Sequence, residues 1–173
     1  MTREGVTFSL EITTSGWASQ DGFILRKDPV GTPESAFFIF WSDTPDGVFS
    51  DPCMLTEGPP VGSAADLAEA VARMPDMEVV REPTDIVVGA HLGKHVAVTR
   101  PAGMACGPGS TGFGLWYDQK VGGRWPTGSG STINVWIIDV DGRLVWIDGE
   151  TFPGASAAIE QEIHQIVDSI EFD

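Results

Sequence analysis

The sequence predicts an α+β fold, with a largely antiparallel sheet of about seven strands flanked by two main helices. Three observations predict it: several short segments alternate apolar and polar residues, hairpin-type turn residues separate them, and only two segments show helical spacing. A parallel sheet would need a helix between most pairs of strands. The chain has 173 residues, an ordinary single-domain length, so we expect residues 1–173 to form one domain around one core.

The first third of the chain is predicted to form strands. Residues 6–12 alternate apolar and polar side chains, as in a half-buried strand, and residues 23–27 form a second apolar segment. Residues 36–41 are so uniformly apolar that we expect a central strand. Residues 42–60 are rich in Pro, Gly and Asp and are predicted to form a long surface loop. That loop contains Cys53.

A first helix is predicted to begin after Ser63. The hydroxyl of Ser63 can accept a hydrogen bond from the backbone three residues later, and Asp66 lies near the positive end of the helix dipole. Apolar residues follow at helical spacing from Leu67 to Met74, and Pro75 ends the pattern. We therefore expect this helix to pack one apolar stripe on the sheet.

Further strands are predicted in the middle of the chain. They comprise residues 77–80, 85–88, 95–99 and 113–117, with residues 89–93 as a hairpin turn. Residues 101–112 and 122–131 are predicted to form irregular loops. Within the first of these, residues 107–112 match the G-x-G-x-x-G pattern, but a dinucleotide site needs a helix after it, and a strand-like segment follows.

The strongest hairpin signal is the dipeptide Asp141-Gly142, which favours a two-residue turn. It separates the apolar segments 132–140 and 143–148. From residue 155 the pattern becomes helical, with one stripe of isoleucine and valine. We expect a long hairpin followed by a C-terminal helix that packs on the sheet.

The chain has six tryptophans, and they are more informative than any polar group. Trp136 and Trp146 lie ten positions apart across the predicted hairpin, so we expect them to neighbour each other on one sheet face. Trp125 lies in a Pro/Gly loop beside Arg124, where no core pattern requires it. We therefore predict a contact surface containing Trp125 and Arg124, with Trp116 as a further candidate.

The formal net charge of −15 argues against several kinds of partner. Binding of nucleic acid requires clustered Lys and Arg, and anionic membranes also attract basic surfaces, so we expect neither partner. No apolar run approaches the length of a transmembrane helix. The N-terminus lacks the pattern of an export signal, so we expect that any signal has been removed or that the chain is a piece of a longer protein.

Catalytic and metal motifs are weak in this sequence. Asp139 and Asp141 resemble the start of an EF-hand loop, but that loop also needs a third ligand position and a closing Glu twelve residues from its start, and the flanks here are strand-like. His91 and His95 have zinc-like spacing, but His91 lies in the predicted turn and His95 begins the next strand, so the two do not share a helical face. We predict no cofactor and no metal. The alternative is a hydrolytic enzyme that uses Asp139, Asp148 and Glu150 with a histidine.

The two cysteines, Cys53 and Cys106, both lie in predicted loops. From the residues alone a disulfide, a metal ligand, a nucleophile and a free thiol are all conceivable. Two cysteines cannot make a structural zinc site without two suitably arranged histidines. If the two were paired, the bridge would close a long loop and would indicate an oxidising compartment.

Several segments resemble a family of small extracytoplasmic domains of actinobacteria. They are VTFSLEITTSGW, FIFWSDTPDGVFSDPC, GPPVGSAADLAEAVARMP, PTDIVVGAHLGKHVAVT, VWIIDVDGRLVWI and EIHQIVDSIEF. Members of that family occur alone, in lipoproteins, or at the C-terminus of multidomain membrane proteins. The resemblance implies a PsbP-like fold, an extracytoplasmic location and a Cys53–Cys106 bridge, and it implies no catalytic residues.

We therefore expect a non-catalytic extracytoplasmic binding or sensory domain for a protein or small-molecule ligand. The contact surface is predicted at Arg124, Trp125, Trp116 and the loops around the two cysteines. Besides the hydrolytic enzyme, a purely structural module of a larger membrane-associated protein is an alternative.

Overall fold

A computed structural model of the chain describes residues 2–3, 5–20, 22–27, 29, 32–41, 44–110, 112–120, 122–126 and 128–173. Its largest sheet has seven strands, and all neighbouring strands are antiparallel. In spatial order they are β3 (Trp17–Gln20), β4 (Ile24–Lys27), β5 (Ala36–Phe40), β13 (Arg143–Thr151), β12 (Thr132–Val140), β9 (His91–Thr99) and β8 (Glu78–Val88). The predicted α+β class and the seven-stranded antiparallel sheet are confirmed.

Two smaller sheets accompany this main sheet. The first, here called the small sheet, contains β11 (Gly122–Gly123), β10 (Trp116–Asp118), β6 (Gly47–Asp51) and β7 (Thr56–Glu57). The second contains β1 (Thr2–Arg3), β2 (Val6–Ser9) and β14 (Glu171–Phe172). Strands β6 and β7 correct the prediction that residues 42–60 form only a loop. Their apolar residues are few, so the sequence pattern alone did not indicate them.

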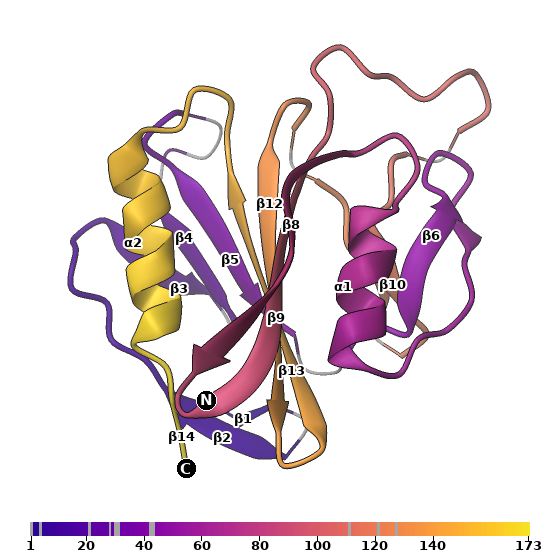
Figure 1. The fold of residues 1–173 in the computed structure, drawn as a ribbon. Coiled ribbons are helices and arrows are strands. Elements are labelled where there is room, and N and C mark those ends of the chain that lie inside the picture. The colour runs from indigo at the N-terminus through magenta and orange to yellow at the C-terminus, as the bar shows by residue number, and fades with distance from the viewer. Residues whose placement is uncertain are drawn as a thin grey trace.

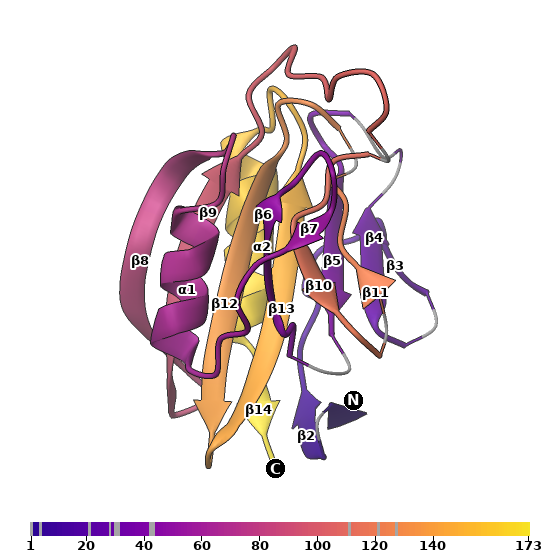
Figure 2. The ribbon, with the colours of Figure 1, turned by 90° about the vertical axis from the view of Figure 1, so that its right-hand side faces the viewer.

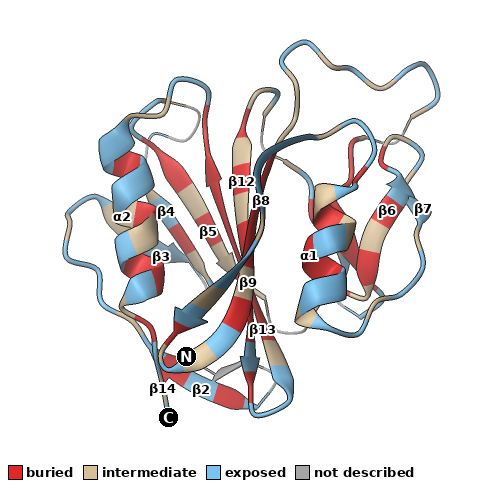
Figure 3. Ribbon diagram, viewed as in Figure 1, coloured by how far each residue is buried: buried red, intermediate tan, exposed pale blue. Residues whose placement is uncertain are grey.

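The two predicted helices are present, α1 (Ala64–Ala72) and α2 (Ala157–Asp168). The Ser63 hydroxyl oxygen accepts a hydrogen bond from the backbone N–H of Asp66 at 3.0 Å, as predicted. Ser156 caps α2 in the same way, accepting from the N–H of Ile159 at 3.3 Å. Both helices turn a buried stripe towards the main sheet and an exposed face to solvent (Figure 3).

The helices cover opposite faces of the main sheet (Figure 1). One core packs against α2 and contains Trp136, Ile138 and Ile147; the other packs against α1 and contains Val135, Ile137 and Trp146. Figure 2 shows the small sheet beside α1 on this second face. The main sheet is thus buried on both faces, which explains the nearly uninterrupted apolar runs of β12 and β13 and gives two cores where we expected one.

The hairpin of β12 and β13 turns at Asp141-Gly142 as predicted, but the expected pairing of its tryptophans is wrong. Trp136 lies opposite Ile147, and Trp146 lies opposite Ile137. A two-residue turn pairs residues an odd number of positions apart, and side chains alternate along a strand. The tryptophans therefore lie on opposite faces of the sheet.

Strand β8 forms one edge of the main sheet. It is a single strand where the sequence predicted two, and it continues through Pro83. Its pairing with β9 is irregular on both sides of Arg81. Because proline has no N–H and register irregularities disturb the edge, addition of another strand to β8 is disfavoured.

Candidate functional site

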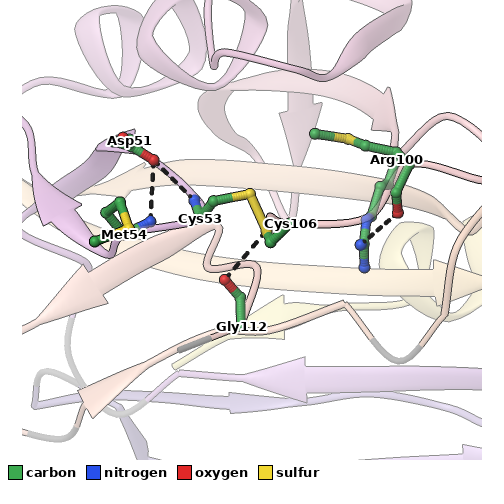
Figure 4. Close-up of a disulfide and its surroundings, with 7 residues drawn as sticks. Asp51, Cys53, Met54, Arg100, Cys106 and Gly112 are labelled. Atoms are coloured by element: carbon green, nitrogen blue, oxygen red, sulfur yellow. Dashed lines mark hydrogen bonds between the residues drawn. A yellow bond between two sulfur atoms is a disulfide. The ribbon is translucent and has the colours of Figure 1, made fainter. Parts of the chain in front are cut away.

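A disulfide joins Cys53 to Cys106, with their Cα atoms 5.4 Å apart (Figure 4). Cys53 lies in the turn between β6 and β7, and Cys106 lies in the irregular segment between β9 and β10. The bond therefore ties the small sheet to the long connection that leaves the main sheet. The implied pairing is confirmed, and it is compatible with an extracellular protein.

Asp51 shapes the turn that holds Cys53. Its carboxylate oxygen Oδ1 accepts hydrogen bonds from the backbone N–H groups of Cys53 and Met54, both at 3.0 Å (Figure 4). Pro52 fixes the backbone between them, and Leu55 closes the turn with a positive φ of 55°. The sequence Asp-Pro-Cys thus builds a tight turn that presents Met54 to solvent.

The segment after Cys106 folds back along this turn. The backbone N–H of Gly114 donates to the carbonyl of Pro52 at 2.8 Å. Cys106 Sγ lies 3.4 Å from the carbonyl oxygen of Gly112; because a disulfide sulfur has no proton to donate, this is a close contact. A Cβ atom at Gly114 would lie 2.6 Å from the side chains of both Leu55 and Phe49, so a larger residue here would force these side chains to shift.

Two large apolar side chains are exposed beside the disulfide. Met54 is 57% exposed and Trp125 is 45% exposed. The indole of Trp125 lies against the backbone of Gly112, where an added Cβ would be 3.6 Å from Nε1. Met54, Cys53, Cys106, Gly112 and Trp125 therefore form a continuous set of bonded or contacting groups, which we call the stapled-loop surface.

Beneath Trp125 lies a buried charge cluster. The guanidinium of Arg124 donates from Nε to Asp148 Oδ1 at 3.0 Å and from Nη2 to Glu150 Oε2 at 2.7 Å. Its Nη1 donates to the carbonyl oxygen of Trp125. Trp41 Nε1 donates to the other oxygen of Asp148 at 2.5 Å. Arg124 therefore anchors the loop that carries Trp125 to strand β13.

All three charged side chains of the cluster are out of solvent. The side chain of Arg124 is 5% exposed, and those of Asp148 and Glu150 are 0% exposed. Burial raises the pKa of Asp148, although Arg124 and the hydrogen bond from Trp41 oppose that shift. Burial also opposes the charge of Arg124, but the two carboxylates outweigh it and raise the pKa of the guanidinium, which stays protonated.

The prediction that Arg124 and Trp116 contribute to a contact surface is wrong. The guanidinium of Arg124 is buried and forms ion pairs with Asp148 and Glu150. Trp116 is 0% exposed and packs edge-on against Trp146, with 5.1 Å between ring centroids. Trp125 is exposed as expected. Sequence analysis missed Met54, whose position beside a cysteine in a tight turn was a usable signal.

The carboxylates of the hydrolytic hypothesis do not converge. Asp148 and Glu150 are paired with Arg124, whereas Asp139 accepts a hydrogen bond from the backbone N–H of Gly142 at 2.7 Å in the hairpin turn. Asp139 lies opposite Leu144, four residues along β13 from Asp148. In the described part of the chain, no three His, Cys, Asp or Glu side chains are grouped closely enough to hold a metal ion.

No protein-family model matches the chain, and no curated protein sequence is significantly similar to it. Among the described residues, neither helix has the length and apolar character needed to cross a membrane.

Proposed function

We propose that this chain is a non-catalytic extracytoplasmic binding domain, and that the stapled-loop surface contacts a basic protein segment carrying an exposed apolar side chain. The observation that carries the proposal is the exposure of Trp125 and Met54 beside the disulfide, above polar groups that are already paired. Tryptophan and methionine are enriched in protein interfaces.

Rigidity of the surface supports this function. The disulfide holds the turn that carries Met54, and Arg124 holds the backbone of Trp125. Ordering flexible side chains and loops at an interface opposes binding, at about 0.5–1.5 kcal/mol for each mobile side chain. A surface fixed before contact avoids much of that loss.

The β6–β7 side of the surface and the charge of the whole chain favour a basic partner. Residues 44–62, which carry the β6–β7 turn, contain Asp46, Asp51 and Glu57 and have no Lys or Arg, whereas the segment that carries Cys106 and Trp125 is not acidic. The whole chain carries a formal net charge of −15. A positive segment would therefore be attracted to this face and oriented on it, with an attraction that weakens as salt is added.

The extracytoplasmic location is part of the proposal. Disulfides persist in oxidising compartments and are rare in the cytosol of mesophilic cells. The resemblance to extracytoplasmic domains supports the same location. Because that resemblance implies no catalytic residues, it also supports a binding function.

Selection of binding peptides from a random display library tests this function. We expect the selected peptides to contain Lys or Arg flanking an aromatic or aliphatic residue, and we expect the double variant M54A/W125A to bind them at least about tenfold more weakly, since each interface anchor contributes about 1–2 kcal/mol. Binding is measured by fluorescence anisotropy at two salt concentrations.

The double variant V87A/L92A is the matched control, because Val87 and Leu92 are exposed apolar residues on the β8–β9 hairpin. It should bind the peptides as the wild type does. Peptides that lack basic residues, or that bind M54A/W125A undiminished, would overturn the proposal. A library that yields no binder would favour a purely structural module.

A further inference from the structure

A second group of polar side chains lies on the other face of the main sheet, beside α2. The imidazole of His95 stacks on Trp136, with ring centroids 4.8 Å apart and planes 7° from parallel. Its Nε2 lies 2.9 Å from Asn134 Oδ1, so the neutral ring carries its proton on Nε2. His164 of α2 contacts both rings edge-on, with its centroid 5.5 Å from that of His95.

A small cavity opens beside these rings. Its volume is about 120 Å³, and the side chains of Arg81, Thr132, Asn134, Glu160 and His164 contribute polar groups to its lining. This is room for about four water molecules, or for one compact polyatomic ion. Because Asn134 Oδ1 faces His95, the amide nitrogen of Asn134 remains to donate to a ligand.

The cavity is lined by one arginine, one glutamate and the titratable His164. Arg81 is exposed on β8, and in the part of the chain that the structure describes it forms no ion pair. Glu160 on α2 supplies the opposite charge at the lining. With both histidines neutral, Arg81 and Glu160 cancel. One proton on His164 makes the lining positive.

Burial favours the neutral form of both histidines in the free protein. Burial lowers the pKa of His95 from 6.5 to about 4, with smaller contributions from His164 and Arg81 that are opposed by Asn134. Burial and Arg81 lower the pKa of His164, whereas Asp168 and Glu160 oppose that shift. A bound anion would act in the same direction as those carboxylates and would favour the protonated ring.

We propose that the cavity between β8, β12 and α2 binds a compact oxyanion, a carboxylate or phosphate group, together with one proton. Arg81 supplies the permanent charge, His164 takes up the proton and donates to the anion, and Thr132 and Asn134 add neutral hydrogen bonds. Glu160 opposes anion binding until His164 is charged. The site is separate from the stapled-loop surface and does not depend on the function proposed there.

Titration of the protein with sodium phosphate and, separately, with sodium acetate tests the site, with sodium chloride at equal ionic strength as the reference. The readout is the imidazole NMR signals of the three histidines at about pH 5.5 and about pH 7.5. We expect saturable shifts of His164 and His95, with affinity for acetate rising by up to about tenfold per unit of falling pH, the limit for uptake of one proton. His91, which packs on Phe172, should not move and serves as the internal control.

The variants R81Q and H164Q should each abolish the saturable shifts. R73Q is the matched control, since Arg73 is an exposed arginine at the end of α1. Binding of one anion alone would uphold the site and identify its ligand group. Absence of saturation with both anions, unchanged binding in R81Q, or acetate affinity independent of pH would each overturn the proposal.

Discussion

The two faces of the main sheet accommodate buried polar groups in opposite ways. On the α1 face, Arg124 keeps its charge because Asp148 and Glu150 pair with it. On the α2 face, burial favours the neutral forms of His95 and His164. Removing a charged group from water is unfavourable, so a buried ionisable group either pairs with an opposite charge or adopts its neutral form. The first face should therefore be sensitive to loss of a partner or of the disulfide, and the second to pH.

We expect the largest change in stability when Arg124, the buried cation on the α1 face, is replaced. The variant R124M keeps similar apolar volume but leaves two carboxylates buried without their partner. We expect the free energy of unfolding to fall by about 5 kcal/mol, near the upper end for breaking a buried ion pair. Urea unfolding at neutral pH measures it.

The triple variant R124M/D148N/E150Q sharpens this test. It removes the buried charges together, so we expect it to be more stable than R124M alone. R73M, at an exposed ion pair with Glu69, should change stability by less than about 1 kcal/mol. If R124M were as harmless as R73M, the contrast between the two faces would not hold.

A somewhat smaller loss is expected when the disulfide is removed. It closes a loop with a sequence separation of 53 residues, for which the chain-entropy model gives about 4 kcal/mol. We expect C53S/C106S to lose about that much stability, with the histidine NMR signals of the α2 face unchanged. Thiol titration of the denatured, unreduced wild type should find no free thiol. Two free thiols would contradict both the bridge and the proposed location.

The smallest of the three effects is the pH response of the α2 face. In the unfolded chain the histidines take up protons near pH 6.5, whereas folded His95 stays neutral down to about pH 4. The resulting stability is fully present above about pH 6.5 and is lost as the pH falls towards 4. For His95 the loss is at most about 3 kcal/mol.

The variant H95Q should flatten this pH dependence, and H91Q should leave it unchanged. Unfolding free energies measured from about pH 4 to about pH 7 make the comparison. An equally steep loss of stability in H95Q would assign the acid sensitivity to other groups.

Much of the fold could be predicted because its signals are local. The Asp141-Gly142 turn and the Ser63 cap each depend on a few adjacent residues, and both are as predicted. The faces of Trp136 and Trp146 were also determined by local geometry, since a two-residue turn fixes the register. Residues ten positions apart cannot lie opposite each other across such a turn, so the expected pairing was wrong.

The candidate site was harder to predict because it depends on contacts between distant segments. Arg124 lies in a Pro/Gly-rich stretch whose composition is typical of a solvent-exposed loop. Its burial follows from pairing with residues of β13. A signal was present: Asp148 and Glu150 follow the apolar run 144–147 on the same strand, on the face that also carries Trp146. Carboxylates at such positions require a cation, and the chain has only ten lysines and arginines to supply it.

The disulfide should also limit the effect of proteolytic cleavage. Helix α1 and strands β8 and β9 all lie between Cys53 and Cys106 in the chain. A single cut in this interval, for example at the exposed Ala102-Gly103 turn, would leave both pieces covalently joined. Such a nicked molecule would run as one band on a gel without reductant and as two bands with it, and the packed sheet would hold the pieces in place.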